Sequence, residues 1–295
     1  MINQLFGTGQ PLFFFHRGDA RNFPENSMQA IVSALNSVSP YVEIDIVDFV
    51  DQQQGRLGLI YHCTDCQSIL AKSKKIGKYS SLQYLKNATG LSNVVTFIEL
   101  LDYLQTLEQN FVISLDIKED NPNVALSFGR WLASELMQRN LESHFIISSP
   151  FKLALDGIRQ VSENVLIGSI VVRDHPFMKQ ISPLMTMLDY DFTNRVKLFI
   201  NFYIRKKIKA YHHDLILFPL SFILQHPEYI DYWRNKRKTD LVGAYQDSDD
   251  FDVQQFDIQV LQKLNWVEMH GRYFDEFQQV IQQPKLYSAL EAPCA

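Results

Sequence analysis

The stretch FFFHRGDARNFPENSMQAIVSAL, residues 13–35, contains a strand pattern, a polar loop and a helix pattern in close succession. The three phenylalanines are typical of a buried strand, and this run ends at His16 and Arg17. After the loop, Asn26 or Ser27 can cap a helix that extends to about residue 37. The stretch therefore predicts one βα unit with ionisable groups at the tip of its strand.

The rest of the chain repeats this alternation of short β-rich runs and helical patterns, which favours parallel strands. Candidate strands lie at 12–16, 41–47, 111–116, 144–148, 165–171, 214–218, 239–245 and 266–269. A further short run, 57–62, follows the second strand. The stretch 121–140 carries an apolar stripe at helical spacing, and we expect that stripe to pack in the core.

Eight strands with intervening helices predict an α/β fold, a (β/α)8 TIM barrel, as a single domain over residues 1–295. A doubly wound sheet is the alternative, and the strand count favours the barrel. Residues 172–213 are too long for one plain βα connection, so we expect an insertion there. Because βα loops carry specificity in barrels, the insertion should lie over or beside the mouth.

The composition is that of a globular protein, with 46% hydrophobic and 21% charged residues. A net charge of -5 gives no reason to expect a nucleic-acid partner. The first residues lack the basic stretch and cleavage site of a secretory signal, and three cysteines are too few for a disulfide framework. We therefore expect a cytoplasmic protein, while noting that export without a cleaved signal leaves no trace in a sequence.

Two predicted strands carry carboxylates on a face that a buried strand fills with apolar groups. Alternation puts Glu43 and Asp45 on one face of YVEIDIV, and it puts Asp116 and Lys118 on one face of FVISLDIK. Two like charges about 4 Å apart repel by roughly 4 kcal/mol at an effective dielectric near 20, so such a cluster needs a cation. Oxygen ligands in this number suit Mg²⁺ or Ca²⁺. The alternative is a surface edge strand, or salt bridges to Lys118 and Arg17.

Two histidines end hydrophobic runs, His16 in FFFH and His62 in LIYH. Because imidazole titrates near neutral pH, two such residues beside a carboxylate cluster can act as an acid/base pair. The sequence His62-Cys63-x-x-Cys66 is a rival metal signal. It lacks the second ligand pair of a zinc site, so we expect ordinary thiols at both cysteines.

The order of these motifs resembles the glycerophosphodiester phosphodiesterases. HRG is followed by PEN, then by E-x-D, then by a histidine that ends the next run, and the resemblance covers about residues 12–120. It implies a barrel of the group that includes phosphatidylinositol-specific phospholipase C and sphingomyelinase D. The resemblance implies that His16 and His62 form an acid/base pair. It implies that Glu43, Asp45 and Asp116 bind one Mg²⁺ or Ca²⁺ ion. It also implies that Arg17 and Lys118 bind the substrate phosphate. Parity and strand order require the three carboxylates to converge within reach of one ion.

Several positions depart from the family pattern. Cys63 stands where the family usually has Asp, and Asp116 stands where most members have Glu, as in the D-x-K of the sphingomyelinase D branch. The stretches LVGAYQD and VEMHGR, the latter around His270, replace the family's motifs W-T-V-N and T-D-x-P. These changes affect the substrate wall more than the catalytic core.

The resulting hypothesis is a metal-dependent phosphodiesterase that hydrolyses a small glycerophosphodiester or a related lipid-derived phosphodiester. One alternative is headgroup cleavage of the sphingomyelinase D or lysophospholipase D type, indicated by Asp116 and by residues 198–209. In that stretch apolar groups precede four basic residues, as in a segment that contacts a membrane surface; a solvated helix with one packed face is the other interpretation. Because the carboxyl-terminal motifs are lost, a second alternative is a non-catalytic barrel that acts as a binding or effector protein.

Overall fold

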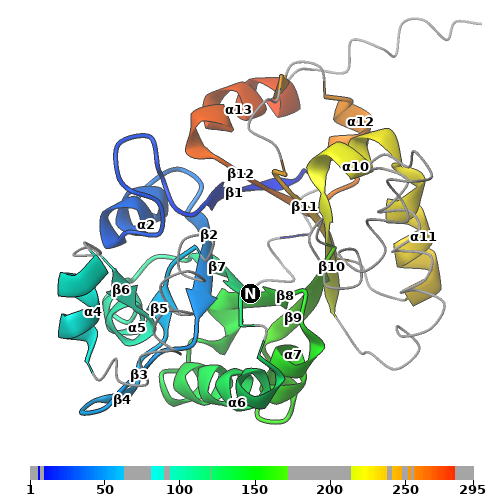
Figure 1. The fold of residues 1–295 in the computed structure, drawn as a ribbon. Helices are drawn as coiled ribbons and strands as arrows, with labels where there is room; N and C mark the ends of the chain where they lie inside the picture. Colours follow the sequence, from blue (N-terminus) through cyan, green and yellow to red (C-terminus); the bar gives the residue numbers. More distant parts are fainter. Residues whose placement is uncertain are drawn as a thin grey trace, which may run out of the picture.

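The computed structural model describes residues 6, 10–62, 81–89, 94–119, 121–171, 214–237, 241–247, 252–253 and 256–282. Within these ranges eight parallel strands form a closed barrel with helices around it, as Figure 1 shows. In chain order the strands are β1 (Leu12–His16), β2 (Tyr41–Val47), β7 (Val112–Ile117), β8 (Phe145–Ser149), β9 (Leu166–Ile170), β10 (Leu215–Pro219), β11 (Leu241–Tyr245) and β12 (Trp266–Met269). The predicted TIM barrel is confirmed, and every barrel strand coincides with a predicted run to within two residues.

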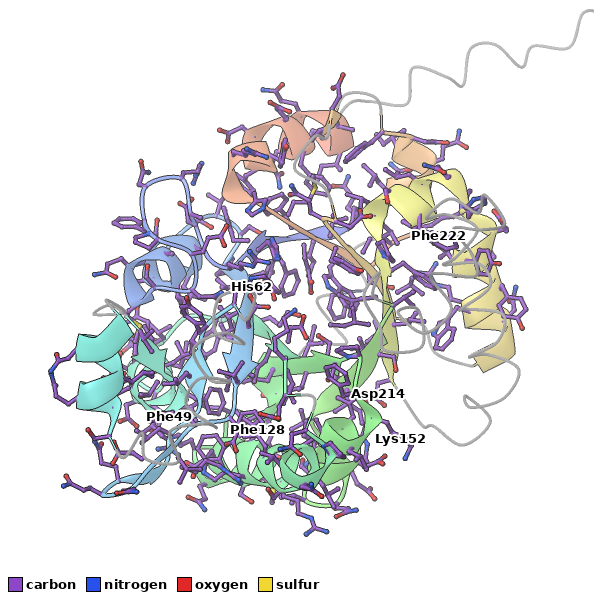
Figure 2. The ribbon with its side chains drawn as sticks, in the orientation of Figure 1. Phe49, His62, Phe128, Lys152, Asp214 and Phe222 are labelled. Carbon is purple, nitrogen blue, oxygen red and sulfur yellow. The ribbon has the colours of Figure 1, made fainter. Side chains whose placement is uncertain are left out.

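The described helices lie outside the barrel. They are α2 (Met28–Leu35), α4 (Leu82–Thr89), α5 (Phe97–Leu104), α6 (Pro122–Gln138), α7 (Lys152–Arg159), α10 (Leu220–Gln225), α11 (Glu228–Arg237), α12 (Ile258–Leu261) and α13 (Phe274–Gln282). Ser27 caps α2, since its Oγ accepts a hydrogen bond from the backbone N–H of Ala30. Phe128 of α6 and Phe222 of α10, both labelled in Figure 2, are fully buried in the layer between helices and strands.

A short extension of the sheet follows β2. The predicted run 57–62 contains β5 (Leu59–Ile60), which pairs antiparallel with β2 and with β6 (Val95–Thr96). The chain reaches β5 through a hairpin of β3 (Val50–Asp51) and β4 (Gly55–Arg56). Because β5 runs back along the end of β2, the chain returns to the mouth of the barrel just before His62.

The interior of the barrel is apolar at its amino-terminal end. Its cluster includes one to two inward side chains from seven of the strands, namely Phe14, Val112, Ile146, Ile170, Leu215, Leu217, Leu241 and Trp266. Since side chains alternate along a strand, the residues two and four positions further along also face inward. This parity brings polar side chains of β1, β2, β7 and β12 to the carboxyl end of the barrel.

Some predicted features lie outside the described residues: the insertion at 172–213 with its segment 198–209, and the two cysteines Cys63 and Cys66. Among the described helices, none has both the length and the apolar character that crossing a membrane requires.

Candidate active site at the carboxyl end of the barrel

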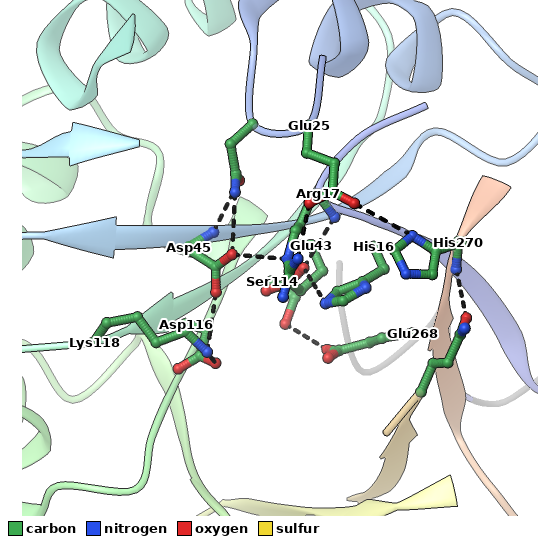
Figure 3. Close-up of polar contacts among 12 residues, drawn as sticks. His16, Arg17, Glu25, Glu43, Asp45, Ser114, Asp116, Lys118, Glu268 and His270 are labelled. Carbon is green, nitrogen blue, oxygen red and sulfur yellow. Dashed lines mark hydrogen bonds and ion pairs between the residues drawn. The ribbon is translucent and has the colours of Figure 1, made fainter. Parts of the chain in front are cut away.

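Three buried carboxylates meet where β2 and β7 end. Asp45 lies opposite Asp116 in the parallel register, and Glu43 lies opposite Ser114. One carboxylate oxygen from each of Glu43, Asp45 and Asp116 lies within 4.8 Å of the others. The predicted convergence of these side chains is therefore confirmed, and Figure 3 shows them in one cluster.

Two cations contact this cluster. Lys118 Nζ lies 3.0 Å from Asp45 Oδ1 and forms a second ion pair with Asp116 Oδ2. Arg17 Nε lies 3.1 Å from Asp45 Oδ2, and its Nη1 lies 2.8 Å from Glu25 Oε2. From the sequence, salt bridges to Lys118 and Arg17 are the alternative to a metal site. These salt bridges are present, and they involve the same carboxylates as the candidate metal site.

Burial shapes the protonation of these acids. Burial alone would raise the pKa of Asp45, but the neighbouring Lys118 and Arg17 hold this pKa well below its usual range. Burial raises the pKa of Asp116 to about 6 despite the opposing charge of Lys118. It also raises the pKa of Glu43 well above its usual value, and the adjacent Asp45 adds to this shift. Lys118 and Arg17 therefore offset the cost of burial fully at Asp45 but not at Asp116 or Glu43.

The residues present fit a divalent cation. Two permanent cations, Arg17 and Lys118, serve a larger set of buried carboxylates in this interior. Asp116 Oδ1 is buried and has no hydrogen-bond partner, so it is available as a ligand atom. Three carboxylates, with no thiolate among the candidate ligand atoms, are a donor set for Mg²⁺ or Ca²⁺.

His16 ends β1 with its ring inside the barrel. Its Nε2 lies 3.6 Å from Glu43 Oε2, and its Nδ1 is buried with no hydrogen-bond partner. Burial lowers the pKa of His16 well below its usual value, and the charge of Arg17 lowers it further. The imidazole is therefore neutral near pH 7 and can accept a proton.

His62 is brought to the same mouth from another direction. The backbone N–H of Tyr61 donates a 3.0 Å hydrogen bond to the carbonyl oxygen of Asp45, which ties the end of β5 to the carboxylate cluster. Burial lowers the pKa of His62, while the charge of Asp45 partly offsets this. Figure 2 shows His62 on the β2 side of the barrel.

The loop between β1 and α2 is closed at both ends by residues in the left-handed region. Arg17 has φ 59° and Asn26 has φ 57°, and the backbone N–H of Asn26 donates to the Arg17 carbonyl at 2.9 Å. Asn26 Nδ2 donates to Asp45 Oδ2 at 3.1 Å, and Asn26 Oδ1 accepts from the Asp45 backbone N–H at 3.2 Å. Gly18, with φ 82°, passes so close to α2 that an added Cβ would lie 2.8 Å from the Ala30 carbonyl carbon. Asn26 therefore orients the carboxylate of Asp45, and the absence of a side chain at Gly18 lets the loop pack directly against α2.

Sequence reasoning missed Glu268. Its Oε1 accepts hydrogen bonds from Ser114 Oγ at 2.7 Å and from Trp266 Nε1 at 3.0 Å, and burial raises its pKa to about 7. The alternation that revealed Glu43 and Asp45 in the second strand also holds for Trp266 and Glu268 in β12. Applying that parity to every predicted strand would have found this residue.

Glu25 and His270 were also absent from the predicted site. His270 follows β12, and its ring centroid lies 4.9 Å from that of His16. Its Nδ1 lies 3.7 Å from Glu25 Oε1, so the loop that carries Arg17 also contacts the last barrel strand. Figure 3 shows His16, His270 and Glu25 beside the carboxylate cluster.

No protein-family model and no curated protein matches the sequence. Several solved structures match the fold. A candidate glycerophosphodiester phosphodiesterase from Galdieria sulphuraria is 16% identical, with a TM-score of 0.64 over 92% of this chain and 97% of that one. A glycerophosphodiester phosphodiesterase from Parabacteroides distasonis is 13% identical, with a TM-score of 0.59 over 92% and 97%. An Oleispira antarctica phosphodiesterase, in complex with its product sn-glycerol-3-phosphate, is 15% identical, with a TM-score of 0.55 over 94% and 99%. At these identities the likeness establishes a shared barrel fold.

Proposed function

We propose that this protein is a phosphoric diester hydrolase that cleaves a small glycerophosphodiester at the carboxyl end of its barrel. The observation that carries the proposal is the convergence of Glu43, Asp45 and Asp116 beside His16. The matching fold of glycerophosphodiester phosphodiesterases supports it. The sn-glycerol-3-phosphate bound to the Oleispira antarctica neighbour supports a phosphodiester that contains a glycerophosphate group.

Glu43, Asp45 and Asp116 would hold one Mg²⁺ or Ca²⁺ ion. When bound, such an ion supplies Lewis-acid polarisation of a phosphoryl oxygen. Arg17 and Lys118 contact the same carboxylates through N–H groups that can equally donate to a phosphate oxygen. We propose that these two residues bind the substrate phosphate and counter the charge that develops on it.

Hydrolysis needs two proton transfers, one from the attacking hydroxyl and one to the leaving alcohol. The neutral imidazole of His16 is suited to the first transfer. The second belongs to another histidine: His62 on the sequence resemblance, or His270 on its contact with His16. Attack by an internal hydroxyl of the substrate would give a cyclic phosphate, which a second cycle of the same groups would open.

Headgroup cleavage of an intact lysolipid is the second candidate. The observation that favours it is Asp116, which matches the D-x-K of the sphingomyelinase D branch. A glycerophosphodiester remains the better proposal, because two of the structural neighbours named above carry that activity in their names. Either substrate would place the protein in lipid metabolism.

Turnover of a panel of glycerophosphodiesters, lysolipids and sphingomyelin, with and without EDTA, tests the proposal. We expect a water-soluble glycerophosphodiester to be cleaved, the activity to disappear in EDTA, and added Mg²⁺ or Ca²⁺ to restore it. Cleavage of lysolipids alone, together with co-sedimentation with vesicles, would select the second candidate. A folded protein that turns over no member of the panel would contradict both and support a binding or effector role.

A further inference from the structure

Glu268 lies at the floor of the candidate active site. It is opposite Phe14 of β1 in the strand register, and it faces the barrel interior as Trp266 does. It comes two residues before His270, which places it about 7 Å deeper along the strand. Only 4% of its surface is exposed. A group of the substrate that reaches Glu268 must therefore enter the barrel.

A hydrogen bond across the barrel fixes the carboxylate of Glu268. Ser114 Oγ on β7 donates to Oε1 at 2.7 Å, and Trp266 Nε1 donates to the same oxygen at 3.0 Å. Since β1 and β2 separate β12 from β7 in the sheet, the bond from Ser114 crosses the interior. Ser114 is opposite Glu43 in the register and two residues before Asp116. The bond therefore lies beneath the candidate metal site, as Figure 3 shows.

The other carboxylate oxygen of Glu268 is available to a ligand. Within the described part of the chain, both hydrogen bonds to this carboxylate go to Oε1 and none goes to Oε2. Oε2 is also not enclosed by protein atoms, in contrast to Asp116 Oδ1. A carboxylate oxygen in such an interior needs a hydrogen-bond donor or a cation, and Lys118 and Arg17 pair with other carboxylates. The donor for Oε2 therefore comes from a molecule in the mouth of the barrel.

The charge of Glu268 limits which group of the substrate it can bind. A carboxylate repels a phosphate, so the group at Oε2 is a hydrogen-bond donor and the phosphate lies toward Arg17 and Lys118. In the proposed reaction the hydroxyl next to the phosphate ester attacks phosphorus, which leaves the terminal hydroxyl of glycerol as a donor. The leaving alcohol must depart through the open mouth, whereas Glu268 lies below it. The terminal hydroxyl of the glycerol group therefore fits this position.

We propose that Glu268 binds the terminal hydroxyl of the glycerol group through Oε2 and so selects glycerol phosphodiesters over phosphodiesters of simpler alcohols. This inference rests on the proposed function and adds the group that recognises glycerol. Ser114 and Trp266 are positioning residues, because their hydrogen bonds to Oε1 leave Oε2 to the substrate. A site built around a hydrogen bond to a substrate hydroxyl rejects the analogue that lacks it, since a polar group of the protein is then left unpaired.

Two substrates that differ in one hydroxyl test the proposal. They are the p-nitrophenyl phosphodiesters of glycerol and of propylene glycol, each joined through a primary hydroxyl and assayed with saturating Mg²⁺ or Ca²⁺. Both have the attacking hydroxyl and the same leaving group, but only the first has the terminal hydroxyl. We expect the wild type to prefer the glycerol ester by about 10–100-fold in kcat/KM, the range for one hydrogen bond to a charged group.

Glu268→Met should reduce this preference to about threefold or less, because methionine fills a similar space without a strong acceptor. Glu268→Gln should reduce it less, and its carbonyl oxygen can still accept from Ser114 and Trp266, so it serves if the first variant fails to fold. Tyr245→Phe is the matched control. Tyr245 is opposite Glu268 in the register, but its hydroxyl donates to the Val171 carbonyl at 2.7 Å, so the preference should not change. Thermal unfolding checks the folding of each variant.

An unchanged preference in folded Glu268→Met and Glu268→Gln would give Glu268 a structural role and overturn the inference. Wild-type protein that cleaves the two esters equally well would also overturn it, while the proposed function would stand. A loss in Glu268→Met that is confined to glycerophosphoethanolamine, compared with the ethyl ester of glycerol phosphate, would instead place the ammonium of a leaving group at Glu268. Wild-type protein that cleaves neither p-nitrophenyl ester would contradict the proposed function itself, and with it the role of Glu268.

Discussion

The two sides of the barrel interior differ in chemistry although both follow the same alternation of side chains. On β12, β1, β2 and β7 the inward positions near the mouth carry imidazole and carboxylate groups. On β8 to β11 most inward positions carry small or apolar residues, among them Ser148, Gly168 and Gly243. Tyr245 at the end of β11 is the exception, and its hydroxyl donates a 2.7 Å hydrogen bond to the Val171 carbonyl. One side thus holds the imidazole and carboxylate groups. The other side is mainly apolar, and charges interact strongly beside such a surface of low polarity.

The apolar side is closely packed. A Cβ added at Gly243 would lie 2.3 Å from the ring of Trp266, and one at Gly168 would lie 1.9 Å from Leu215. The indole N–H of Trp266 in turn donates to Glu268 at 3.0 Å. Packing against the apolar side therefore helps to hold Trp266, which in turn holds Glu268 on the polar side. We expect substitutions on the polar side to change activity and substitutions on the apolar side to change stability.

The largest expected effect is that of Asp45→Asn. It removes the carboxylate that contacts both Lys118 and Arg17, and we expect a loss of about 10³-fold in turnover. Charge stabilisation at a metal site contributes several kcal/mol, and about 1.4 kcal/mol corresponds to a factor of ten. The matched control is Ser148→Ala. Ser148 lies on β8, opposite Asp116 in the strand register, and its side chain is as fully buried as that of Asp45. Comparable losses of turnover in Asp45→Asn and Ser148→Ala would contradict the proposed difference between the two sides of the barrel.

A smaller effect is expected for Asn26→Ala. The side chain of Asn26 holds the carboxylate and the backbone of Asp45 without being a proposed ligand. Loss of such a supporting group typically weakens metal binding by about 10–100-fold. We therefore expect the concentration of Mg²⁺ or Ca²⁺ needed for half-maximal activity to rise by about 10–100-fold. An unchanged metal requirement would show that Asp45 keeps its position without Asn26.

Leu217→Ala should affect activity least. Leu217 is fully buried in the apolar interior, and its truncation should lower the free energy of unfolding by about 2–5 kcal/mol. Turnover per folded molecule, measured well below the unfolding temperature, should stay near that of the wild type. A large loss of turnover in protein that is still folded would show that the apolar side takes part in the chemistry.

The sequence predicts much of this structure because its signals are local. Apolar runs of four to seven residues between helical patterns give the eight strands, and parity within YVEIDIV places Glu43 and Asp45 on one face. The same parity would have given Glu268, which belongs to no motif.

Other features depend on contacts between distant segments. The contact between the His16 and His270 rings exists because the first barrel strand, β1, pairs with the last, β12, when the barrel closes. The contact of Glu25 with His270 depends on the path of the β1–α2 loop across that junction. Sequence could not separate a metal site from salt bridges either, since Lys118 and a divalent cation neutralise the same carboxylates.

Calorimetric titration of Mg²⁺ and Ca²⁺ into the wild type and into Asp116→Asn tests the central claim most directly. Asp116 has a buried oxygen without a hydrogen-bond partner, and asparagine keeps its shape while removing its charge. We expect one ion to bind per wild-type chain and binding to be lost or strongly weakened in the variant. Undiminished binding by Asp116→Asn, or no binding by the wild type, would contradict a divalent-cation site at these carboxylates.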